Sequence, residues 1–307
     1  MEDITGELLG VLTVLCWTLS VQFFEFASKR VGAVTVNIVR ISVALSLFSL
    51  LLYYRQGVLL PTHFPLQSWF LLSLSGIVGF FIGDIFLFRA LVELGPRLTM
   101  LIQTLAAPMA ALIGWWFLDE KYRIFQWLGM LVTLIGVYTV VLEKNGRVGG
   151  AQKLTSRPRS RFGVWFALLA MLGQAIGLIL SKAGMRVEGG YLDPFEATHV
   201  RVFAAFVCFA LFSTVTGKVT RVVVALKDRK AIGATAIGAT LGPFIGVSLS
   251  LWSLHFMTAG VAATLFSLTP VCIIPFGIFL HKEQVSVRAM VGAVVAVAGV
   301  YLLTVQY

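Results

Sequence analysis

Apolar residues fill this chain in ten blocks of about 20 residues, separated by short polar stretches. Each block is long enough to cross the hydrocarbon core of a bilayer as a helix, and lipid offers no hydrogen-bond partners to an open sheet. The alternating segments of a transmembrane barrel do not occur in the sequence. The pattern therefore predicts an all-α integral membrane protein. Its ten expected transmembrane helices are 8–28, 34–54, 69–91, 97–118, 124–142, 162–182, 195–216, 231–255, 260–280 and 286–305.

The second half of the chain repeats the first. Gly129–Tyr138 (GMLVTLIGVY) returns 163 residues later as Gly292–Tyr301 (GAVVAVAGVY). Five helices per copy is an odd number, so the second copy must enter the membrane from the opposite side. The sequence therefore predicts two inverted five-helix repeats, with the substrate site of a transporter at their interface. The other matched pairs are Glu120 with Glu283, Gly79–Gly83 with Gly242–Gly246, Ser28-Lys29 with Ser181-Lys182, and Arg40 with Arg201.

A basic linker separates the two repeats. Residues 144–161 are rich in Gly, Ser, Lys and Arg, a composition typical of a flexible, solvated connection. We therefore expect the first repeat to occupy residues 1–143 and the second to occupy 162–307.

The distribution of positive charge predicts the orientation. Of the 24 Lys and Arg residues, Arg40 and Arg201 lie well inside expected spans, 17 lie on the side of the linker, and five lie on the side of the N-terminus. The positive-inside rule then places the linker in the cytoplasm and both termini outside. The start Met1–Glu7 is acidic, unlike a signal peptide, so the first block is expected to be a retained span. We expect a multi-pass protein of the cell membrane, of the bacterial inner-membrane type.

Composition agrees with a membrane protein and argues against several other classes. Hydrophobic residues make up 58% of the chain, charged residues 12%, and mean hydropathy is +0.92, whereas soluble domains carry about 25% charged residues. The net charge of +10 sits in short loops, so no nucleic-acid partner is expected. Cys16, Cys208 and Cys272 lie in apolar blocks without motif spacing, so neither a disulfide nor a metal is implied. Walker, nucleophile-elbow and HExxH motifs do not occur, and we expect no cofactor and no enzymatic activity.

Two oppositely charged residues lie at matching depth in the first repeat. Arg40 is about six residues into the second span and Asp84 about seven from the end of the third, so their depths agree to about one helical turn. One interpretation is a structural ion pair. The other is that Asp84 exchanges a proton or meets a cationic group of the substrate, with Glu25 as a second candidate for proton coupling.

The second repeat breaks this pattern. Arg201 occupies the place of Arg40, but Val247 stands where an acid matching Asp84 would be. Arg201 could pair with Glu196 or Asp193, contact backbone carbonyls, or accept a substrate carboxylate. Structural and substrate-binding roles both stay open.

Polar and aromatic residues in span interiors complete a candidate substrate pocket between spans 1, 3, 4, 6, 8 and 9. The alternative is that the amides hold helices together, because buried amides need hydrogen-bond partners. The expected substrate-binding residues are Trp17, Thr18, Gln22, Asp84, Phe88, Gln103, Gln174, Arg201 and Trp252. Glycines at four-residue spacing in spans 3 and 8 predict close helix packing, and Pro108 and Pro270 predict bends at related places.

An ordered set of motifs resembles the EamA-type members of the drug/metabolite transporter superfamily. The set covers essentially the whole chain. It comprises Val14-Leu15-Cys16-Trp17-Thr18, Val39-Arg40-Ile41, Ala106-Ala107-Pro108-Met109, Trp116-Phe117-Leu118-Asp119-Glu120, Gln126-Trp127-Leu128-Gly129 with Gly136-Val137, Ser267-Leu268-Thr269-Pro270-Val271, Lys282-Glu283, and Gly292 through Gly299-Val300. The resemblance implies a ten-helix inverted-repeat transporter, often an exporter of amino acids, drugs or other metabolites.

We therefore expect a secondary transporter that exports amino acids or other small organic metabolites by alternating access. Its partners would be that small molecule, the lipid bilayer and, as a candidate coupling ion, the proton; the oligomeric state stays open. The alternatives are a lipid-translocating protein and a membrane-embedded lipid enzyme. A laterally open apolar groove would favour lipid, and a closed central cavity would favour a soluble metabolite.

Overall fold

The computed structural model describes residues 4–94, 96–142, 161–217, 219–273 and 287–304. The linker 144–160 and the end of the expected ninth span, 274–280, lie outside these residues. Within them, eight helices are long and apolar enough to cross a membrane, and the shorter apolar segments Ala259–Ile273 and Val287–Leu303 lie where the ninth and tenth spans were expected. The described residues therefore form an all-α membrane protein, in which eight membrane-length helices and two shorter apolar segments lie at the places of the ten expected spans.

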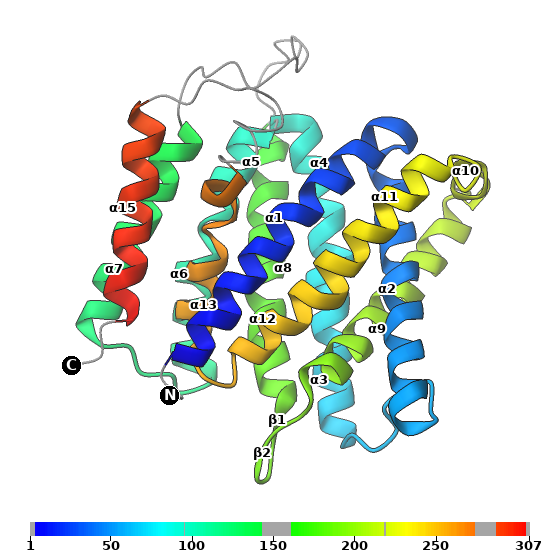
Figure 1. The fold of residues 1–307 in the computed structure, drawn as a ribbon, viewed down its shortest axis with the longest axis horizontal. Helices are drawn as coiled ribbons and strands as arrows, with labels where there is room; N and C mark the ends of the chain where they lie inside the picture. Colours follow the sequence, from blue (N-terminus) through cyan, green and yellow to red (C-terminus); the bar gives the residue numbers. More distant parts are fainter. Residues whose placement is uncertain (1–3, 95, 143–160, 218, 274–286, 305–307) are drawn as a thin grey trace.

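The first repeat contains α1 (Thr5–Val31), α2 (Ala33–Gln56), α3 (Leu66–Gly76), η2 (Ile77–Ile82), α4 (Gly83–Leu94), α5 (Pro96–Gln103), α6 (Ala106–Phe117) and α7 (Ile124–Leu142). The second contains α8 (Arg161–Met185), the two-residue strands β1 (Arg186–Val187) and β2 (Gly190–Tyr191), α9 (Pro194–Val215), α10 (Val219–Ala225), α11 (Arg229–Ala239), η3 (Thr240–Gly246), α12 (Val247–Ser253), α13 (Ala259–Phe266) and α15 (Val287–Thr304). The strands form a small antiparallel hairpin outside the helical bundle (Figure 1).

The two repeats run through the bundle in opposite directions. In Figure 1, α1 begins at the lower end of the bundle, whereas α7 ends and α8 begins at the upper end. We call the lower end, where α1 begins and α15 ends, the N-terminal face. The upper end, where α7 ends and α8 begins, is the linker face.

Glycine contacts between α7 and α15 show that a two-fold relation connects the repeats. A side chain on Gly129 would meet the carbonyl of Gly299, and a side chain on Gly292 would meet the carbonyl of Gly136. The two contacts are equivalent, because Gly292 lies 163 residues after Gly129 and Gly299 lies 163 residues after Gly136. Small residues let these two helices approach closely (Figure 1), which is the packing that drives helix association in lipid.

Spans 3 and 8 change from α to π geometry at related places. The segments η2 and η3 begin 163 residues apart, at Ile77 and Thr240. In η3 the ring of Pro243 removes a backbone donor, which interrupts the regular ladder. Spans 4 and 9 are also interrupted at related places, since α5 ends at Gln103 and α13 ends at Phe266. Both interruptions fall shortly before the prolines that predicted bends.

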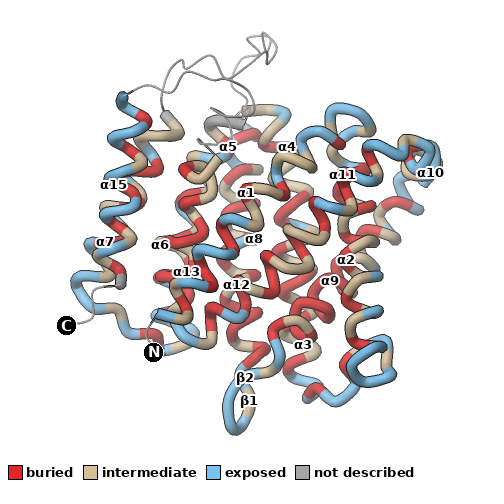
Figure 2. Tube along the Cα trace, viewed as in Figure 1, coloured by how far each residue is buried: buried red, intermediate tan, exposed pale blue. Residues whose placement is uncertain are grey.

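The buried residues concentrate where the two repeats meet (Figure 2). Outward-facing side chains are apolar as well: on α15, Met290, Val294, Val297 and Tyr301 are each at least half exposed. Exposed apolar faces on several helices are expected where lipid, not water, surrounds the protein.

Candidate transport pathway

A cavity of about 280 Å³ opens at the linker face between α2, α4 and α9. Its aromatic walls come from Phe88 on α4 and from Phe209 and Phe212 on α9. Its polar groups come from α2 and α4, and they include one guanidinium and one carboxylate. The complete lining is Val34, Asn37, Ile85, Phe88, Arg89, Val92, Glu93, Phe209 and Phe212.

The two-fold related place at the N-terminal face is nearly filled. A pocket of only about 10 Å³ lies there between the end of α2 and the start of α9. The part of its lining that comes from α2 and α9 maps onto that of the large cavity, at the offset of 161 that also relates Arg40 to Arg201: Phe48 corresponds to Phe209, and Phe195 corresponds to Val34. One site of the related pair is therefore open, and the other is closed.

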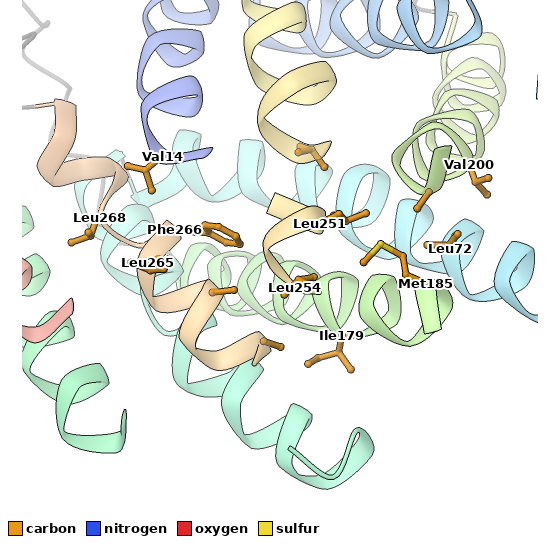
Figure 3. Packing of buried hydrophobic residues seen from close by; sticks show 14 of the residues in the cluster. Val14, Leu72, Ile179, Met185, Val200, Leu251, Leu254, Leu265, Phe266 and Leu268 are labelled. Atoms are coloured by element: carbon orange, nitrogen blue, oxygen red, sulfur yellow. The ribbon is translucent and has the colours of Figure 1, made fainter. Parts of the chain in front are cut away.

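A hydrophobic plug closes the N-terminal half of the bundle (Figure 3). Leu251 and Leu254 of α12 are fully buried, and they belong to a cluster that also includes Leu72 of α3 and Ile179 and Met185 of α8. The counterparts of the two α12 leucines in the first repeat lie on α4, at the linker face. The residue 163 positions before Leu251 is Phe88, which lines the open cavity.

Arg40 and Asp84 form an ion pair next to the cavity. Arg40 donates to the Asp84 carboxylate, whose side chain is only 7% exposed, and the Arg40 guanidinium lies 5.6 Å from the ring centre of Phe24. Asp84 directly precedes Ile85, a lining residue, so the pair lies just beyond the cavity wall. Both charges are compensated within the protein.

Arg201 is different. It is 6% exposed and makes no hydrogen bond or ion pair with any residue that the structure describes. Its guanidinium lies 4.7 Å from the ring centre of Phe80, a cation–π contact. Of the two expected acids, Asp193 caps the start of α9, and Glu196 accepts from Gln56 at 2.5 Å.

The backbone of η2 and α3 approaches Arg201 closely. A side chain on Gly76 would collide with the Arg201 backbone, and a Cβ on Gly79 would lie 3.7 Å from a terminal guanidinium nitrogen. Gln174 of α8 donates to the Gly79 carbonyl at 3.4 Å. A buried cation, an aromatic face and an amide are therefore gathered around one irregular helical segment.

The other expected binding residues are spread through the bundle. Gln103 donates to the Ala167 carbonyl at 3.3 Å, and Trp17 packs against Phe266 with ring centres 5.2 Å apart. Thr18 is fully buried, and its hydroxyl has no hydrogen-bond partner in the described part of the chain, while Gln22 is half-buried. Two residues lie at the surface: Trp252 is 40% exposed, and Glu25 forms an exposed pair with Lys29.

The cavity thus lies between spans 2, 3 and 7, whereas the sequence predicted a pocket between spans 1, 3, 4, 6, 8 and 9. Only Phe88 of the expected binding residues lines it. Glycines explain the difference, because they let span 3 pack directly on span 6. A Cβ on Gly177 would lie 3.1 Å from the Cα of Gly79, and one on Gly173 would lie 3.2 Å from the Cα of Gly83.

Asn37, Arg89 and Glu93 are cavity residues that were not among the expected binding residues. Arg89 and Glu93 are four apart on α4 and therefore share one helix face. The Arg89 guanidinium lies 5.7 Å from the ring centre of Phe166, and one buried Glu93 oxygen has no hydrogen-bond partner among the described residues. The i,i+4 spacing of opposite charges near a span end is the sequence signal that could have identified them.

A buried polar network joins the two repeats at the N-terminal face. Lys182 at the end of α8 donates to Glu120 at 2.7 Å, and the two side chains are 4% and 3% exposed. Both Glu120 oxygens accept from the Ala259 backbone N–H at 3.0 Å. The Tyr122 hydroxyl donates to Glu120 at 2.6 Å and accepts from the Gly260 N–H at 3.1 Å. Burial raises the pKa of Tyr122, so its hydroxyl stays a donor.

Inverted repeats around a cavity open at one face and closed at the other are the organisation of a membrane transporter of small molecules. Comparison with known proteins agrees. A family model described as "EamA-like transporter family" matches residues 4–142 and 161–305, and the chain belongs to this family.

A solved structure titled "Crystal structure of protein" shares the fold. It has a TM-score of 0.72 and 18% sequence identity, and the match covers 97% of this chain and 98% of that one. A search of curated proteins found no match.

Proposed function

We propose that this protein is a secondary transporter that exports small amphipathic metabolites of the amino-acid class by alternating access. The observation that carries the proposal is the unequal pair of two-fold related sites, about 280 Å³ at the linker face and about 10 Å³ at the N-terminal face. Exchanging the conformations of the two repeats would exchange these sites. A substrate bound at one face would then be released at the other.

The lining of the cavity supports a zwitterion with an apolar side chain. Arg89 can meet a carboxylate and Glu93 an ammonium, while Phe88, Phe209 and Phe212 offer aromatic surface. The volume of about 280 Å³ lies just below the usual range for small-molecule pockets, about 300–1,000 Å³, which fits a small metabolite. Charged groups in the lining disfavour a lipid tail as the occupant.

Arg201 extends this pathway toward the middle of the bundle. It lies eight residues from Phe209 on α9, which is about 12 Å along the helix. Because no described residue neutralises it, a carboxylate on the substrate would supply the missing charge in an occluded state. Asp84 remains a candidate for proton coupling, since a proton on its carboxylate would break the pair with Arg40.

Charge distribution gives the proposed direction. If the basic linker face is cytoplasmic, the open cavity loads from the cytoplasm and delivers its substrate outside. Lys29, Arg30 and Arg229 are among the described basic residues at that face.

Filling the cavity tests the proposal. Purified protein in proteoliposomes should exchange labelled L-phenylalanine for unlabelled L-phenylalanine inside, and Phe88→Trp should abolish this counterflow because the larger ring occupies the site. Phe70→Trp is the matched control, since Phe70 lies on the same span but is 66% exposed at the outer surface. Transport by Phe88→Trp at the wild-type rate would contradict the proposed site. Absence of exchange by wild-type protein across all amino acids would contradict the substrate class.

A further inference from the structure

The network of Glu120, Tyr122, Lys182, Met257, Ala259 and Gly260 holds together three segments at the closed face. It connects the loop after α6, the end of α8 and the start of α13. Glu120 and Tyr122 belong to the first repeat, and the other four residues belong to the second. The network therefore bridges the two halves that must separate for this face to open.

Glu120 also stabilises the first turn of α13 from outside that helix. Thr258, the N-cap residue of α13, makes no side-chain hydrogen bond to it. The backbone N–H groups of Ala259 and Gly260, which have no partner within the helix, instead donate to the Glu120 carboxylate and the Tyr122 hydroxyl. A carboxylate at this position also interacts favourably with the helix dipole. Separating the repeats would leave these donors without protein partners.

The repeat partner of Lys182 shows the opposite condition at the open face. Lys29, which matches Lys182 in the Ser-Lys motif, has a side chain that is 72% exposed. Its ion pair within the described part of the chain is the local one with Glu25, at 2.6 Å on the same helix. Within the part of the chain that the structure describes, the lysine is therefore buried in a bridge between repeats at the closed face and exposed at the open face; Glu283, the repeat counterpart of Glu120, lies outside that part.

From this contrast we propose that the Glu120–Lys182 pair is a reversible latch that keeps the N-terminal face closed and separates when that face opens. The inference rests on the alternating access proposed above. A buried ion pair suits a reversible contact because desolvation offsets most of its Coulombic attraction. When the face opens, water replaces each partner. The latch therefore adds specificity to the closed state without making it irreversible.

Reporter cysteines test the latch without a substrate. In protein whose three native cysteines are replaced by alanine, Leu254→Cys reports on the plug at the N-terminal face, and Val34→Cys reports on the cavity at the linker face. Labelling by a hydrophilic maleimide in detergent measures how often each face is open. Glu120→Gln should raise the labelling rate of the Leu254→Cys reporter about tenfold and lower that of the Val34→Cys reporter.

Lys182→Met should act in the same way, and Lys121→Gln is the matched control. Lys121→Gln also changes a charge in the loop after α6, but this side chain is exposed and lies outside the network, so neither reporter should change. Tyr122→Phe is a milder variant in case the charge changes prevent folding. It removes one hydroxyl from the network and should raise Leu254→Cys labelling about threefold.

Two results would overturn the latch. The first is unchanged Leu254→Cys labelling in every folded variant, including Tyr122→Phe. The second is a parallel rise at both reporters, which indicates general loosening of the bundle. Reciprocal labelling together with no amino-acid counterflow would keep the latch and reject the substrate class. Counterflow without reciprocal labelling would keep the substrate class and reject the latch.

Discussion

At the scale of single residues, two related arginines have opposite surroundings. Arg40 is neutralised by Asp84, whereas Arg201 is buried beside Phe80 with no acid among the described residues. From the sequence, the matching depth of Asp84 made an ion pair with Arg40 one of two interpretations, and Val247 at the related position left Arg201 without an obvious acid inside the spans. The sequence did not predict the burial of Lys182, because a lysine near a span end is usually expected to reach water.

The Arg40–Asp84 pair predicts a stability change that a double variant should reverse. Asp84→Asn leaves the Arg40 cation buried without its partner and should lower the free energy of unfolding by about 3–5 kcal/mol. Adding Arg40→Met should recover most of this loss. Thermal unfolding of the three proteins in detergent measures both effects. If the folded double variant keeps wild-type pH dependence of transport, Asp84 has no part in proton coupling.

Arg201 should behave in the opposite way. Arg201→Gln removes an uncompensated buried charge, so stability should stay constant or rise, while counterflow of L-phenylalanine should fall. Arg201→Lys keeps the positive charge but loses the planar guanidinium that can bind a carboxylate through two N–H groups, so this variant should transport at an intermediate rate. The matched ligand is 2-phenylethylamine, which lacks the carboxylate. Equal loss of its binding in Arg201→Gln would argue against carboxylate recognition.

At the scale of elements, glycines decide which helices can touch. The apolar blocks predicted the helices and the repeat predicted their inverted arrangement. The position of the cavity could not be predicted, because it depends on which pairs of helices pack closely. Gly79 and Gly177 bring spans 3 and 6 together, whereas at the related place of the second repeat Gly242 faces the larger side chains of Ser20 and Phe24.

A glycine substitution between α7 and α15 should separate these helices. Gly136→Leu would drive a side chain into the backbone of Ala296 and should destabilise the protein by about 1–3 kcal/mol or more, as overpacking does. Gly233→Ala is the control, because a Cβ there meets nothing within 4 Å and alanine favours a helix. Thermal unfolding should therefore move in opposite directions for the two variants. A neutral Gly136→Leu would contradict the close packing.

At the scale of the whole molecule, two copies of one unit adopt different conformations around a shared interface. The closed face contains the plug and the Glu120–Lys182 pair, and the open face contains the cavity and the exposed Lys29. The repeat itself is visible in the sequence. Which face is open and which is closed depends on how the helices pack, and this could not be predicted from the sequence.

Orientation in the membrane can be tested with one cysteine on each face. In intact cells, a membrane-impermeant maleimide should label Glu188→Cys, in the hairpin at the N-terminal face, and should leave Lys227→Cys unlabelled. Permeabilised cells, in which both should react, serve as the control. The opposite pattern would place the linker face outside and reverse the proposed direction of transport.

Alternating access is tested most directly by measuring both faces at once. Spin labels at Lys121→Cys and Phe256→Cys span the N-terminal face, and labels at Val92→Cys and Val215→Cys span the linker face. Double electron–electron resonance with saturating L-phenylalanine should show a longer distance across the N-terminal face and a shorter one across the linker face. Distances that stay fixed at both faces, or that lengthen at both, would contradict alternating access.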